Sequence, residues 1–440
     1  MTARGLIIAA PASGCGKTMA TLALLRHLSA SSLSVGSFKV GPDFIDPAFH
    51  AATTGRPCRN LDPWSMRLAT LSAALNAVAR DTDLVISEGV MGLFDGADGE
   101  MGSTADLAAR LGLPVVLVVD VGAQAASAGA LIRGFVSHRT DVQVSAVIFN
   151  RVGGALHVET LRDACRALGV PVLGMIPWVD DLTLPERHLG LVQAAEIKGL
   201  DAFLVSAAEI VGRHVDIAEL ARLAAPIPPA LIPPAEPIDA PPITPLGQRI
   251  AVARDAAFAF VYDHVLAGWR NAGCQILPFS PLAGEGVPVG ADAVYLPGGY
   301  PELHAGPIAE NHVLLNGLRD AAARHLPVYG ECGGYMVLGE ALIDADGVRH
   351  LMAGLLPVVT SFADRQMHIG YRTLELVSDT ALGARNIIFR GHEFHFSSVT
   401  SEEASEPLFV ARDVQGGNEV TMGCVRGSVM GSFAHLIDRA

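Results

Sequence analysis

A glycine-rich turn near the N-terminus has the residue types that bind a nucleoside triphosphate. It follows an apolar run at residues 5–10, precedes a helix-forming stretch, and contains Gly14, Cys15, Gly16, Lys17 and Thr18. Glycines at such a turn let backbone N–H groups surround phosphate oxygens, while a lysine reaches the β- and γ-phosphates and a hydroxyl binds Mg²⁺. The turn predicts a site for ATP or GTP with Mg²⁺ as cofactor. Because Ala10 replaces the first glycine of the usual pattern, a plain strand-to-helix turn is the alternative.

A second strand-to-helix turn, late in the chain, presents a cysteine. The apolar run at residues 326–330 leads into Cys332 and Gly333. A nucleophile at such a turn is exposed at the end of its strand, and nearby backbone N–H groups stabilise a developing oxyanion. We expect Cys332 to be a nucleophile, with Gly299 and Gly333 in the oxyanion hole. A buried structural cysteine is the alternative reading.

A nucleophilic cysteine needs a general base, and four histidines of the second half are candidates. His435 lies in the C-terminal stretch GSFAHLID, and its competitors are His368, His392 and His395. Spacing along the chain does not choose among them, because catalytic partners meet in the fold and not in the sequence.

Charged residues follow another short apolar run in the first half. The stretch FKVGPDFIDP carries Lys39, Asp43 and Asp46 beside glycine and proline. Loops at the carboxyl ends of parallel strands are where α/β sheets bind ligands. We expect the two aspartates to serve Mg²⁺ and Lys39 to hold a carboxylate or a transferring phosphate. A turn with solvated charges is the alternative.

Two further strand-like runs of the first half end in polar residues. Residues 84–87 lead into Glu88 and then Asp95, and the run at residues 146–149 ends in Asn150. An acidic residue after an apolar strand is typical of the second metal ligand of P-loop enzymes, so Glu88 is predicted to bind Mg²⁺. Asp95 is a second acidic candidate, with a simple loop cap as its alternative. The amide of Asn150 suits an adenine edge.

The elements that must position these residues alternate between strand and helix in both halves of the chain. β-branched runs separated by Ala- and Leu-rich stretches predict parallel sheets covered by helices, so we expect an α/β fold throughout. Residues 226–245 contain nine prolines among twenty residues, which excludes a helix or a central strand. We therefore expect domains at residues 1–225 and 247–440, joined by a proline-rich linker at 226–246.

The composition indicates a globular protein. Of its 440 residues, 50% are hydrophobic and 17% are charged, and the net charge is −14. Such a chain buries a large core, and its acidity disfavours nucleic acid as a partner. Six scattered cysteines without a metal-binding pattern favour a cytoplasmic location. The apolar stretch at residues 113–132 is better explained by a buried strand and an Ala-rich helix than by a membrane span.

The motifs together resemble the glutamine-dependent corrin a,c-diamide synthases of cobalamin biosynthesis, and the resemblance covers nearly the whole chain. The matching stretches occur in the family's order: APASGCGKT, FKVGPDFIDPAFH, NLDPW, EGVMGLFDG, LPERHLGLVQA, LPGGYPELHA, GECGGYMVLG, HIGYR, GHEFH and GSFAHLID. The resemblance implies a P-loop domain similar to dethiobiotin synthetase followed by a class I glutamine amidotransferase domain. It also implies a ligase whose partners are ATP, L-glutamine and a corrin polycarboxylate.

The resemblance assigns roles to individual residues. In the glutaminase half, Cys332 would attack the glutamine amide and His435 would shuttle the proton. In the synthetase half, a substrate carboxylate would attack the γ-phosphate, and ammonia would then displace phosphate from the acyl phosphate. In the synthetase half, the resemblance also implies that Lys17 and Thr18 bind phosphate and metal and that Asp43 and Glu88 are metal ligands. It places Asp95 at the acyl-phosphate chemistry and Phe44 and Ile45 in contact with the corrin. Cations for the anionic substrate would come from Lys39, Arg187 and His188.

Several choices stay open within this resemblance. Class I glutaminases usually carry a glutamate two residues after the histidine, whereas this chain has Ile437, so the third member of the triad is unassigned. Resemblance in LPERHLGLVQA, PLGQRIAVARDAAFAF and LLPVVTSFADR favours hydrogenobyrinic acid over cobyrinic acid as the substrate. The rival functions are a P-loop ATPase switch with a C-terminal binding module and a cysteine hydrolase regulated by ATP. The sequence also leaves a homodimer open.

Overall fold

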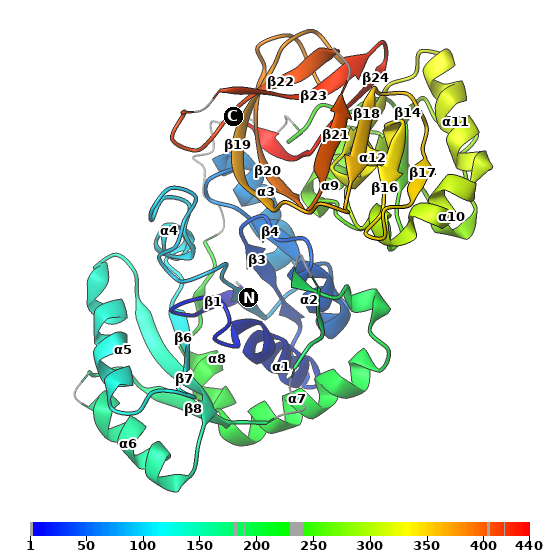
Figure 1. Cartoon of the computed structure of the whole chain (residues 1–440). Helices are drawn as coiled ribbons and strands as arrows, with labels where there is room; N and C mark the ends of the chain where they lie inside the picture. Colours follow the sequence, from blue (N-terminus) through cyan, green and yellow to red (C-terminus); the bar gives the residue numbers. More distant parts are fainter. Residues whose placement is uncertain are drawn as a thin grey trace. The chain divides into compact units, whose positions relative to one another are not determined.

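The chain folds into two compact units, each with its own sheet and hydrophobic core (Figure 1). The computed structural model describes residues 3–166, 168–179, 183–187, 190–228, 241–402, 405–417 and 419–440. The first unit comprises Met1–Trp64 and Leu68–Glu236, and the second comprises Ser65–Arg67 and Pro237–Ala440. A three-residue segment from the first half of the sequence therefore belongs to the second unit.

The proline-rich stretch at residues 226–246 is described only at its two ends, because residues 229–240 lie outside the described residues. Pro226 pairs with Arg4, the first residue of a central strand of the first unit's sheet. Ile243 is buried in the second unit, where its carbonyl accepts a hydrogen bond from the indole of Trp269 at 2.9 Å. Both described ends of this stretch thus pack onto a unit.

A largely parallel sheet is the centre of the first unit. Its strands, in spatial order, are β4 (Arg59–Leu61), β3 (Phe38–Val40), β5 (Leu84–Glu88), β1 (Arg4–Ala9), β6 (Val115–Asp120), β7 (Val144–Val152) and β8 (Val172–Pro177). Short strands add β2 (Val35–Gly36) beside β5 and β11 (Ala225–Pro226) antiparallel to β1, and a separate pair consists of β9 (Glu186–Arg187) and β10 (Gly190–Leu191).

Helices follow most of these strands. They are α1 (Lys17–Ser29), α2 (Asp46–Thr54), α3 (Leu68–Ala79), α4 (Thr104–Leu111), α5 (Ser127–His138), α6 (Ala155–Arg166), α7 (Leu200–His214) and α8 (Ile217–Leu223), with a short 3₁₀ turn at Ala194–Glu196. Helices α1 and α7 pack together, and Leu6 and Ile8 of β1 share one core with Leu24 of α1 and Val211 of α7. The central strands are continuous apolar runs because no face of the sheet is left to solvent.

The second unit contains a mixed sheet whose strands run, in spatial order, β13 (Gln275–Phe279), β12 (Arg249–Ala253), β14 (Ala293–Leu296), β15 (Val328–Glu331), β24 (Val429–Ser432), β23 (Val420–Arg426), β22 (Glu406–Arg412), β19 (His368–Leu376), β20 (Ile388–His395) and β25 (Ala434–Arg439). The first five strands are parallel and the remaining pairs are antiparallel. A smaller sheet is formed by β17 (Arg349–Leu351), β16 (Ala341–Ile343), β18 (Val358–Ser361) and β21 (Ser398–Glu402).

The helices of the second unit are α9 (Asp263–Asn271), α10 (Ala305–Glu310), α11 (His312–Ala323) and α12 (Gly333–Leu338), with 3₁₀ turns at Pro281–Ala283 and Pro301–His304. The buried core joins Leu296 and Val328 of the parallel strands to Met336 of α12 and Leu318 of α11. The alternating strands and helices predicted for both halves are confirmed, and the late antiparallel strands account for the strand-rich sequence near the C-terminus.

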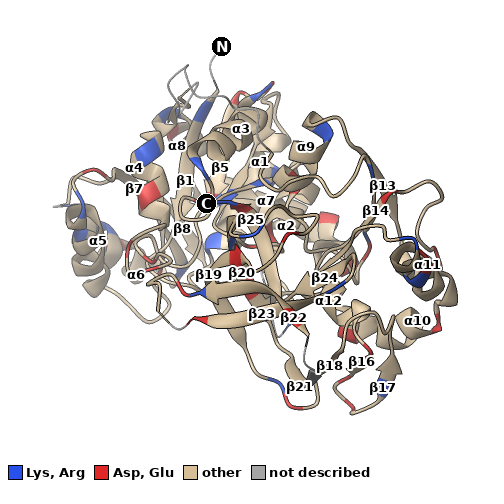
Figure 2. Cartoon of the chain, turned by 90° about the horizontal axis from the view of Figure 1, so that it is seen from above, with Lys and Arg blue, Asp and Glu red and all other residues tan. Residues whose placement is uncertain are grey.

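Charged residues are spread over both units (Figure 2), and the apolar stretch at residues 113–132 forms the elements that the sequence predicts. Lys and Arg are interspersed with Asp and Glu along the ribbons of both units (Figure 2). The apolar stretch at residues 113–132 divides into β6 and the first half of α5, as predicted. Among the described residues, no helix is long and apolar enough to cross a membrane. All six cysteines are free thiols.

Candidate active sites

The glycine-rich turn of the first unit has the backbone of a phosphate-binding loop. Gly14 and Gly16 adopt φ values of 80° and 84°, and α1 begins directly after Gly16 at Lys17. A Cβ on Gly16 would lie 2.1 Å from the side-chain nitrogen of Asn150, so only glycine fits there. That amide nitrogen donates to the carbonyl of Cys15 at 3.1 Å. Asn150, at the end of β7, therefore lies against the loop that the sequence analysis selected.

Glu88 is the centre of a buried polar cluster at the end of β5. One of its oxygens accepts hydrogen bonds from the Thr18 hydroxyl at 2.6 Å and the Lys39 ammonium at 2.8 Å, and the ammonium of Lys17 lies 3.8 Å from it. The other oxygen lies 2.8 Å from Nε2 of His50. Parallel pairing places Ile8 of β1 and Lys39 of β3 opposite Glu88, which brings the three strand ends together.

The cations around Glu88 determine its ionisation. Burial would raise its pKa, but Lys39, His50 and Lys17 together hold the pKa well below its usual range. Burial lowers the pKa of Lys17, and the neighbouring Lys39 lowers it further. Lys39 keeps its charge, because the nearby carboxylates outweigh its burial and raise its pKa. A buried anion beside two buried ammonium groups is a site prepared for phosphate oxygens and a metal ion.

Two residues of α2 extend this cluster. Lys39 also donates to Asp46, and burial, with Asp43 and Glu88 nearby, raises the pKa of the Asp46 carboxyl to about 7. For His50, burial alone would lower the pKa, but Cys58 and Glu88 raise it to about 10. The sequence analysis did not single out His50. Its signal was available, because it follows Asp46 by four residues on one helix and so shares its face.

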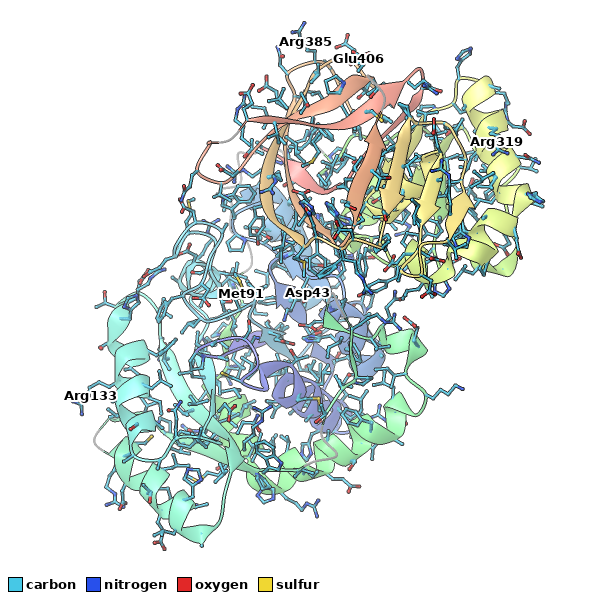
Figure 3. All side chains as sticks on the ribbon, in the orientation of Figure 1. Asp43, Met91, Arg133, Arg319, Arg385 and Glu406 are labelled. Atoms are coloured by element: carbon cyan, nitrogen blue, oxygen red, sulfur yellow. The ribbon has the colours of Figure 1, made fainter. Side chains whose placement is uncertain are left out.

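Asp43 and its neighbours form the loop between β3 and α2. One Asp43 oxygen accepts the backbone N–H groups of Ile45 and Asp46 at 2.6 Å and 3.1 Å, which holds the start of α2. Asp43 and Met91 lie in the loops that leave the carboxyl ends of β3 and β5 (Figure 3). Ile45 is buried, whereas Phe44 is half-buried, so of these two residues Phe44 presents more side chain to a ligand.

Asp95 lies in the loop after β5, which packs against the phosphate-binding loop. Its carboxylate accepts the backbone N–H of Gly92 at 2.9 Å, and the N–H of Leu93 donates to the carbonyl of Ala10 at 2.8 Å. A Cβ on Gly92 would lie 2.6 Å from both an Asp95 oxygen and the carbonyl of Pro11. Asp95 therefore holds the shape of this loop, as its loop-cap alternative describes, and also lies next to the predicted phosphate site.

The predicted substrate cations have different surroundings. Lys39 is buried within the Glu88 cluster. Arg187 donates two hydrogen bonds of 2.9 Å to Glu196. His188 lies outside the described residues.

The cysteine of the second unit lies on a strained turn between β15 and α12. Cys332 adopts φ 47° and ψ −105°, a left-handed conformation that non-glycine residues rarely adopt. Its backbone N–H donates to the carbonyl of Ser432 at 2.8 Å. A Cβ on Gly334 would lie 1.9 Å from the carbonyl of Leu296, so the turn requires glycine for close packing. Burial raises the pKa of the Cys332 thiol, with Glu302 adding to the effect.

His435 and the predicted oxyanion glycines lie beside this cysteine. A Cβ on Gly298 would lie 2.3 Å from Cε1 of His435 and 3.2 Å from Cβ of Cys332, so both side chains flank this glycine. A Cβ on Gly333 would lie 3.2 Å from the backbone nitrogen of Gly299. The structure thus brings together Cys332, His435, Gly299 and Gly333, which are separated by up to 136 positions in the chain.

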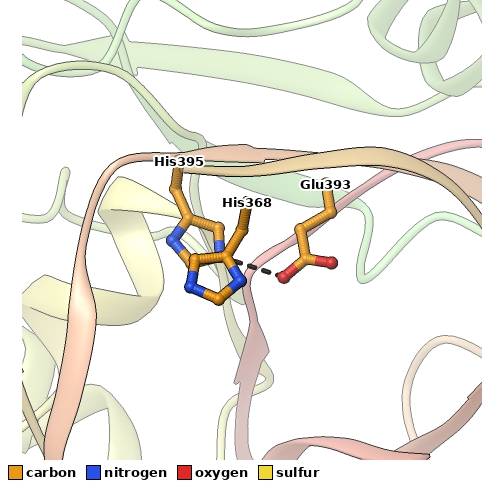
Figure 4. A group of neighbouring side chains, drawn as sticks. All are labelled: His368, Glu393 and His395. Atoms are coloured by element: carbon orange, nitrogen blue, oxygen red, sulfur yellow. Dashed lines mark hydrogen bonds and ion pairs between the residues drawn. The ribbon is translucent and has the colours of Figure 1, made fainter. Parts of the chain in front are cut away.

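The three competing histidines lie on β19 and β20, where other groups contact them. The rings of His368 and His395 stack with centroids 4.6 Å apart, and His395 lies within hydrogen-bond distance of Glu393 (Figure 4). His395 also lies within hydrogen-bond distance of Ser397. Burial lowers the pKa of His392 to about 3, with His435 and Arg372 adding to the effect. These contacts favour His435 as the base.

The same group of side chains has the composition of a metal site, but its carboxylate already binds an arginine. The ligand atoms of His368, Glu393 and His395 lie within 4.8 Å of one another. However, Arg372 places two guanidinium nitrogens 3.0 Å and 2.8 Å from one Glu393 oxygen. The Glu393 carboxylate is thus bonded to both Arg372 and His395, and the group forms a hydrogen-bonded wall beside Cys332, whose thiol lies 3.7 Å from the carbonyl of Phe394.

Comparison with known proteins places both units in one family. A family model described as the CobQ/CobB/MinD/ParA nucleotide binding domain matches residues 6–192, and one described as a CobB/CobQ-like glutamine amidotransferase domain matches residues 249–439. The chain is 50% identical over 440 residues to a hydrogenobyrinate a,c-diamide synthase of Sinorhizobium sp, with 99% of each chain covered. It belongs to the hydrogenobyrinate a,c-diamide synthase family.

Other members of the hydrogenobyrinate a,c-diamide synthase family match over the same length. The chain is 50% identical over 438 residues to the protein of Rhizobium meliloti (strain 1021), with 99% of each chain covered, and 48% identical over 443 residues to that of Mesorhizobium japonicum, with 100% of each covered. The resemblance predicted from the motifs is therefore confirmed. The chain is a glutamine-dependent ligase with a nucleotide-binding domain, and the hypothesis of an ATPase switch with a non-catalytic C-terminal module is not supported.

Proposed function

We propose that this enzyme converts the a and c carboxylates of hydrogenobyrinic acid into amides, using ATP and ammonia released from glutamine. The observation that carries the substrate assignment is the match of about 50% identity, over essentially the whole chain, to proteins named for this product. The residues within each unit support the chemistry. The first unit has a phosphate-binding loop beside buried acids, and the second has a cysteine elbow beside a histidine.

In the first unit, a substrate carboxylate oxygen attacks the γ-phosphorus of ATP, and ADP leaves. Ammonia then attacks the acyl carbon, the proton it sheds is lost to a base or water, and phosphate leaves with the bonding electrons. ATP is needed because a carboxylate does not accept ammonia until one oxygen has become a phosphate leaving group. The ammonium groups of Lys17 and Lys39 offset the phosphate charge, Asp95 shapes the loop beside the acyl phosphate, and Asn150 contacts the adenine.

The residues around Glu88 fit Mg²⁺ as the cofactor. Carboxylate and hydroxyl oxygens are the ligands that this ion prefers, and Thr18 and Glu88 already present theirs 2.6 Å apart. We assign Thr18, Glu88 and Asp43 to the ion. When bound, Mg²⁺ neutralises charge on the β- and γ-phosphates. The hydrogen bond between Thr18 and Glu88 holds both oxygens in place for it.

In the second unit, the Cys332 sulfur attacks the amide carbon of glutamine while His435 accepts its proton. His435 then gives that proton to the departing ammonia, and water hydrolyses the γ-glutamyl thioester to glutamate. Because burial raises the pKa of the Cys332 thiol, the resting sulfur is protonated and the reaction needs this base. The N–H groups of Gly299 and Gly333 bind the developing oxyanion.

The corrin would lie against the loop between β3 and α2, with Phe44 contacting the macrocycle directly and Ile45 supporting it from the core. Arg187 and His188 are further cation candidates for its carboxylates. Cobyrinic acid is the alternative substrate, and it requires no change in either active site's chemistry. A cytoplasmic location and a homodimer stay predictions.

The decisive experiment is mass spectrometry of the corrinoid products after incubation with MgATP, glutamine and either hydrogenobyrinic acid or cobyrinic acid. We expect two successive amidations of the cobalt-free acid. Preference for the cobalt-containing acid would overturn the substrate assignment but keep the reaction. Absence of any amidation, with ammonium chloride as the nitrogen source in a parallel reaction, would overturn the proposed function.

A further inference from the structure

The strand that carries the base His435 has no acid at the position where related glutaminases place one. The position two residues after it is Ile437, a fully buried apolar side chain. The next residue, Asp438, is buried and already paired. Its oxygens accept the backbone N–H of Arg67 at 2.8 Å and the Arg67 guanidinium at 2.9 Å. Strand β25 therefore gives His435 no acid from the usual position.

An acid approaches His435 from the strand that carries the nucleophile. A carboxylate oxygen of Glu331, the residue immediately before Cys332, lies 3.8 Å from Nδ1 of His435. Glu331 is 3% exposed, so its charge is shielded from solvent.

The Glu331 carboxylate is held in place by three donors. The Tyr295 hydroxyl donates at 2.7 Å to the oxygen that faces His435, and the Tyr329 hydroxyl and the backbone N–H of Leu436 each donate at 3.1 Å to the other oxygen. Tyr295 and Tyr329 come from neighbouring strands, and their rings stack with centroids 5.8 Å apart. Burial raises the pKa of both phenols well above the usual value, so both remain hydrogen-bond donors.

We propose that Glu331 is the positioning residue of the glutaminase, replacing the missing acid as the third member of a Cys332, His435, Glu331 triad. This inference rests on the proposed roles of Cys332 and His435. Accepting the Nδ1 proton of His435 leaves the Nε2 lone pair for the thiol proton, and the carboxylate then stabilises the imidazolium that forms. The separation of 3.8 Å is an ion-pair distance, and catalytic hydrogen bonds often tighten from such a length when substrate binds.

The same carboxylate also fixes the distance between nucleophile and base. Glu331 precedes Cys332 on β15, and its bond to the N–H of Leu436 holds the backbone next to His435 on β25. An acid at position 437 could orient the imidazole but would not connect the two strands. Glu331 therefore both orients His435 and sets the spacing between Cys332 and His435.

The test is the variant Glu331→Gln, which keeps the shape of the side chain and removes its charge. We expect kcat/KM for glutamine to fall on the order of 10²- to 10⁴-fold, by analogy with removal of the acid from a serine protease triad. We also expect the acidic limb of its pH profile to move to lower pH by about one unit, because loss of the carboxylate disfavours the imidazolium. Synthesis from ammonium chloride, which needs only the site of the first unit, should stay at the wild-type level, and urea unfolding reports whether the second unit, which carries Glu331, is folded.

Three comparisons keep the inference distinguishable from the roles it rests on. If Cys332→Ser or His435→Asn retains glutamine-dependent synthesis, the proposed catalytic pair is wrong. If both lose it while Glu331→Gln keeps the wild-type rate, only the role of Glu331 is overturned. A slower Glu331→Gln enzyme with an unmoved pH profile would also overturn it, because that result indicates a structural role alone.

A second variant covers the case in which Glu331→Gln does not fold. Tyr295→Phe keeps the carboxylate and removes the donor on the oxygen that faces His435. We expect a fall of roughly tenfold in the glutamine-dependent rate, with synthesis from ammonium chloride at the wild-type level. An unchanged glutamine-dependent rate in this variant would contradict the proposal, because the oriented carboxylate would then have no effect on His435.

Discussion

The hydroxyl of Thr18 lies 2.6 Å from the carboxylate of Glu88, although 70 residues separate them in the chain. The contact follows from the parallel pairing of β1 with β5, which sets Ile8 opposite Glu88 and brings the ends of both strands together. Each oxygen is a suitable magnesium ligand, and the proposed magnesium site requires both residues.

Thr18→Val keeps the side-chain volume and removes the hydroxyl. We expect synthesis from either glutamine or ammonium chloride to fall by at least tenfold at physiological Mg²⁺, because both nitrogen sources use the same acyl phosphate. Initial rates over a range of Mg²⁺ concentrations check this, with Thr18→Ser as the control that restores the hydroxyl. Equal rates for the valine variant and the wild type would remove Thr18 from the metal site.

Lys39→Met tests the buried charge cluster through stability. Its loss leaves Glu88 and Asp46 facing each other without their shared cation, and breaking a buried ion pair in this way costs about 3–5 kcal/mol. Urea unfolding measures the change, with the exposed Lys198→Met as a control expected within about 0.5 kcal/mol of the wild type. If the two variants are equally stable, the cluster does not hold the first unit together.

His392 makes the stability of the second unit depend on pH. Burial lowers its pKa to about 3, so between pH 6.5 and pH 3 the unfolded chain binds a proton that the folded chain does not. The free energy of unfolding should therefore decrease as the pH falls through this range. His392→Gln should make that decrease shallower, as measured by urea unfolding at several pH values. The exposed His312→Gln is the control, and an identical slope for the two variants would contradict the prediction.

Gly298→Ala tests the closeness of the catalytic pair. The new Cβ would lie 2.3 Å from Cε1 of His435, so the imidazole must move away from Cys332. We expect the glutamine-dependent rate to fall by about 100-fold or more while synthesis from ammonium chloride continues. Gly306→Ala is the matched control, because its Cβ would approach only His350, at 3.9 Å. Similar glutamine-dependent rates for both variants would show that Gly298 does not set the position of His435.

The sequence was most informative where one short segment contains a complete strand-turn-helix motif. The phosphate-binding loop at Gly14 to Thr18 and the elbow at Cys332 each combine a strand, a tight turn and a helix start within about ten residues, and local backbone preferences specify such turns. The alternation of apolar strands with helical stretches likewise predicts α/β units, because each strand of a covered sheet is apolar throughout.

Site residues whose interaction partners lie far away in the sequence were harder to assign. His50 shares a helix face with Asp46, but only its contact with Glu88 connects it to the cluster, and Glu88 lies on a strand 38 residues away. Glu331 stands in the same motif as Cys332, yet nothing in that motif relates it to His435. The sequence analysis gave it no role.

By itself, the sequence predicted the fold class and the family, both of which are confirmed, and it indicated the phosphate-binding loop and a candidate nucleophile, because turn chemistry and apolar periodicity act within a few residues. The tertiary structure alone decided which histidine lies beside Cys332 and which acid faces that histidine. Those choices depend on how distant strands pack, since β15 and β25 are separated by about a hundred residues and the pairing of β25 with β20 sets the face on which His435 lies. A one-residue shift of a strand would turn its side chains to the opposite face, and no local pattern specifies that pairing.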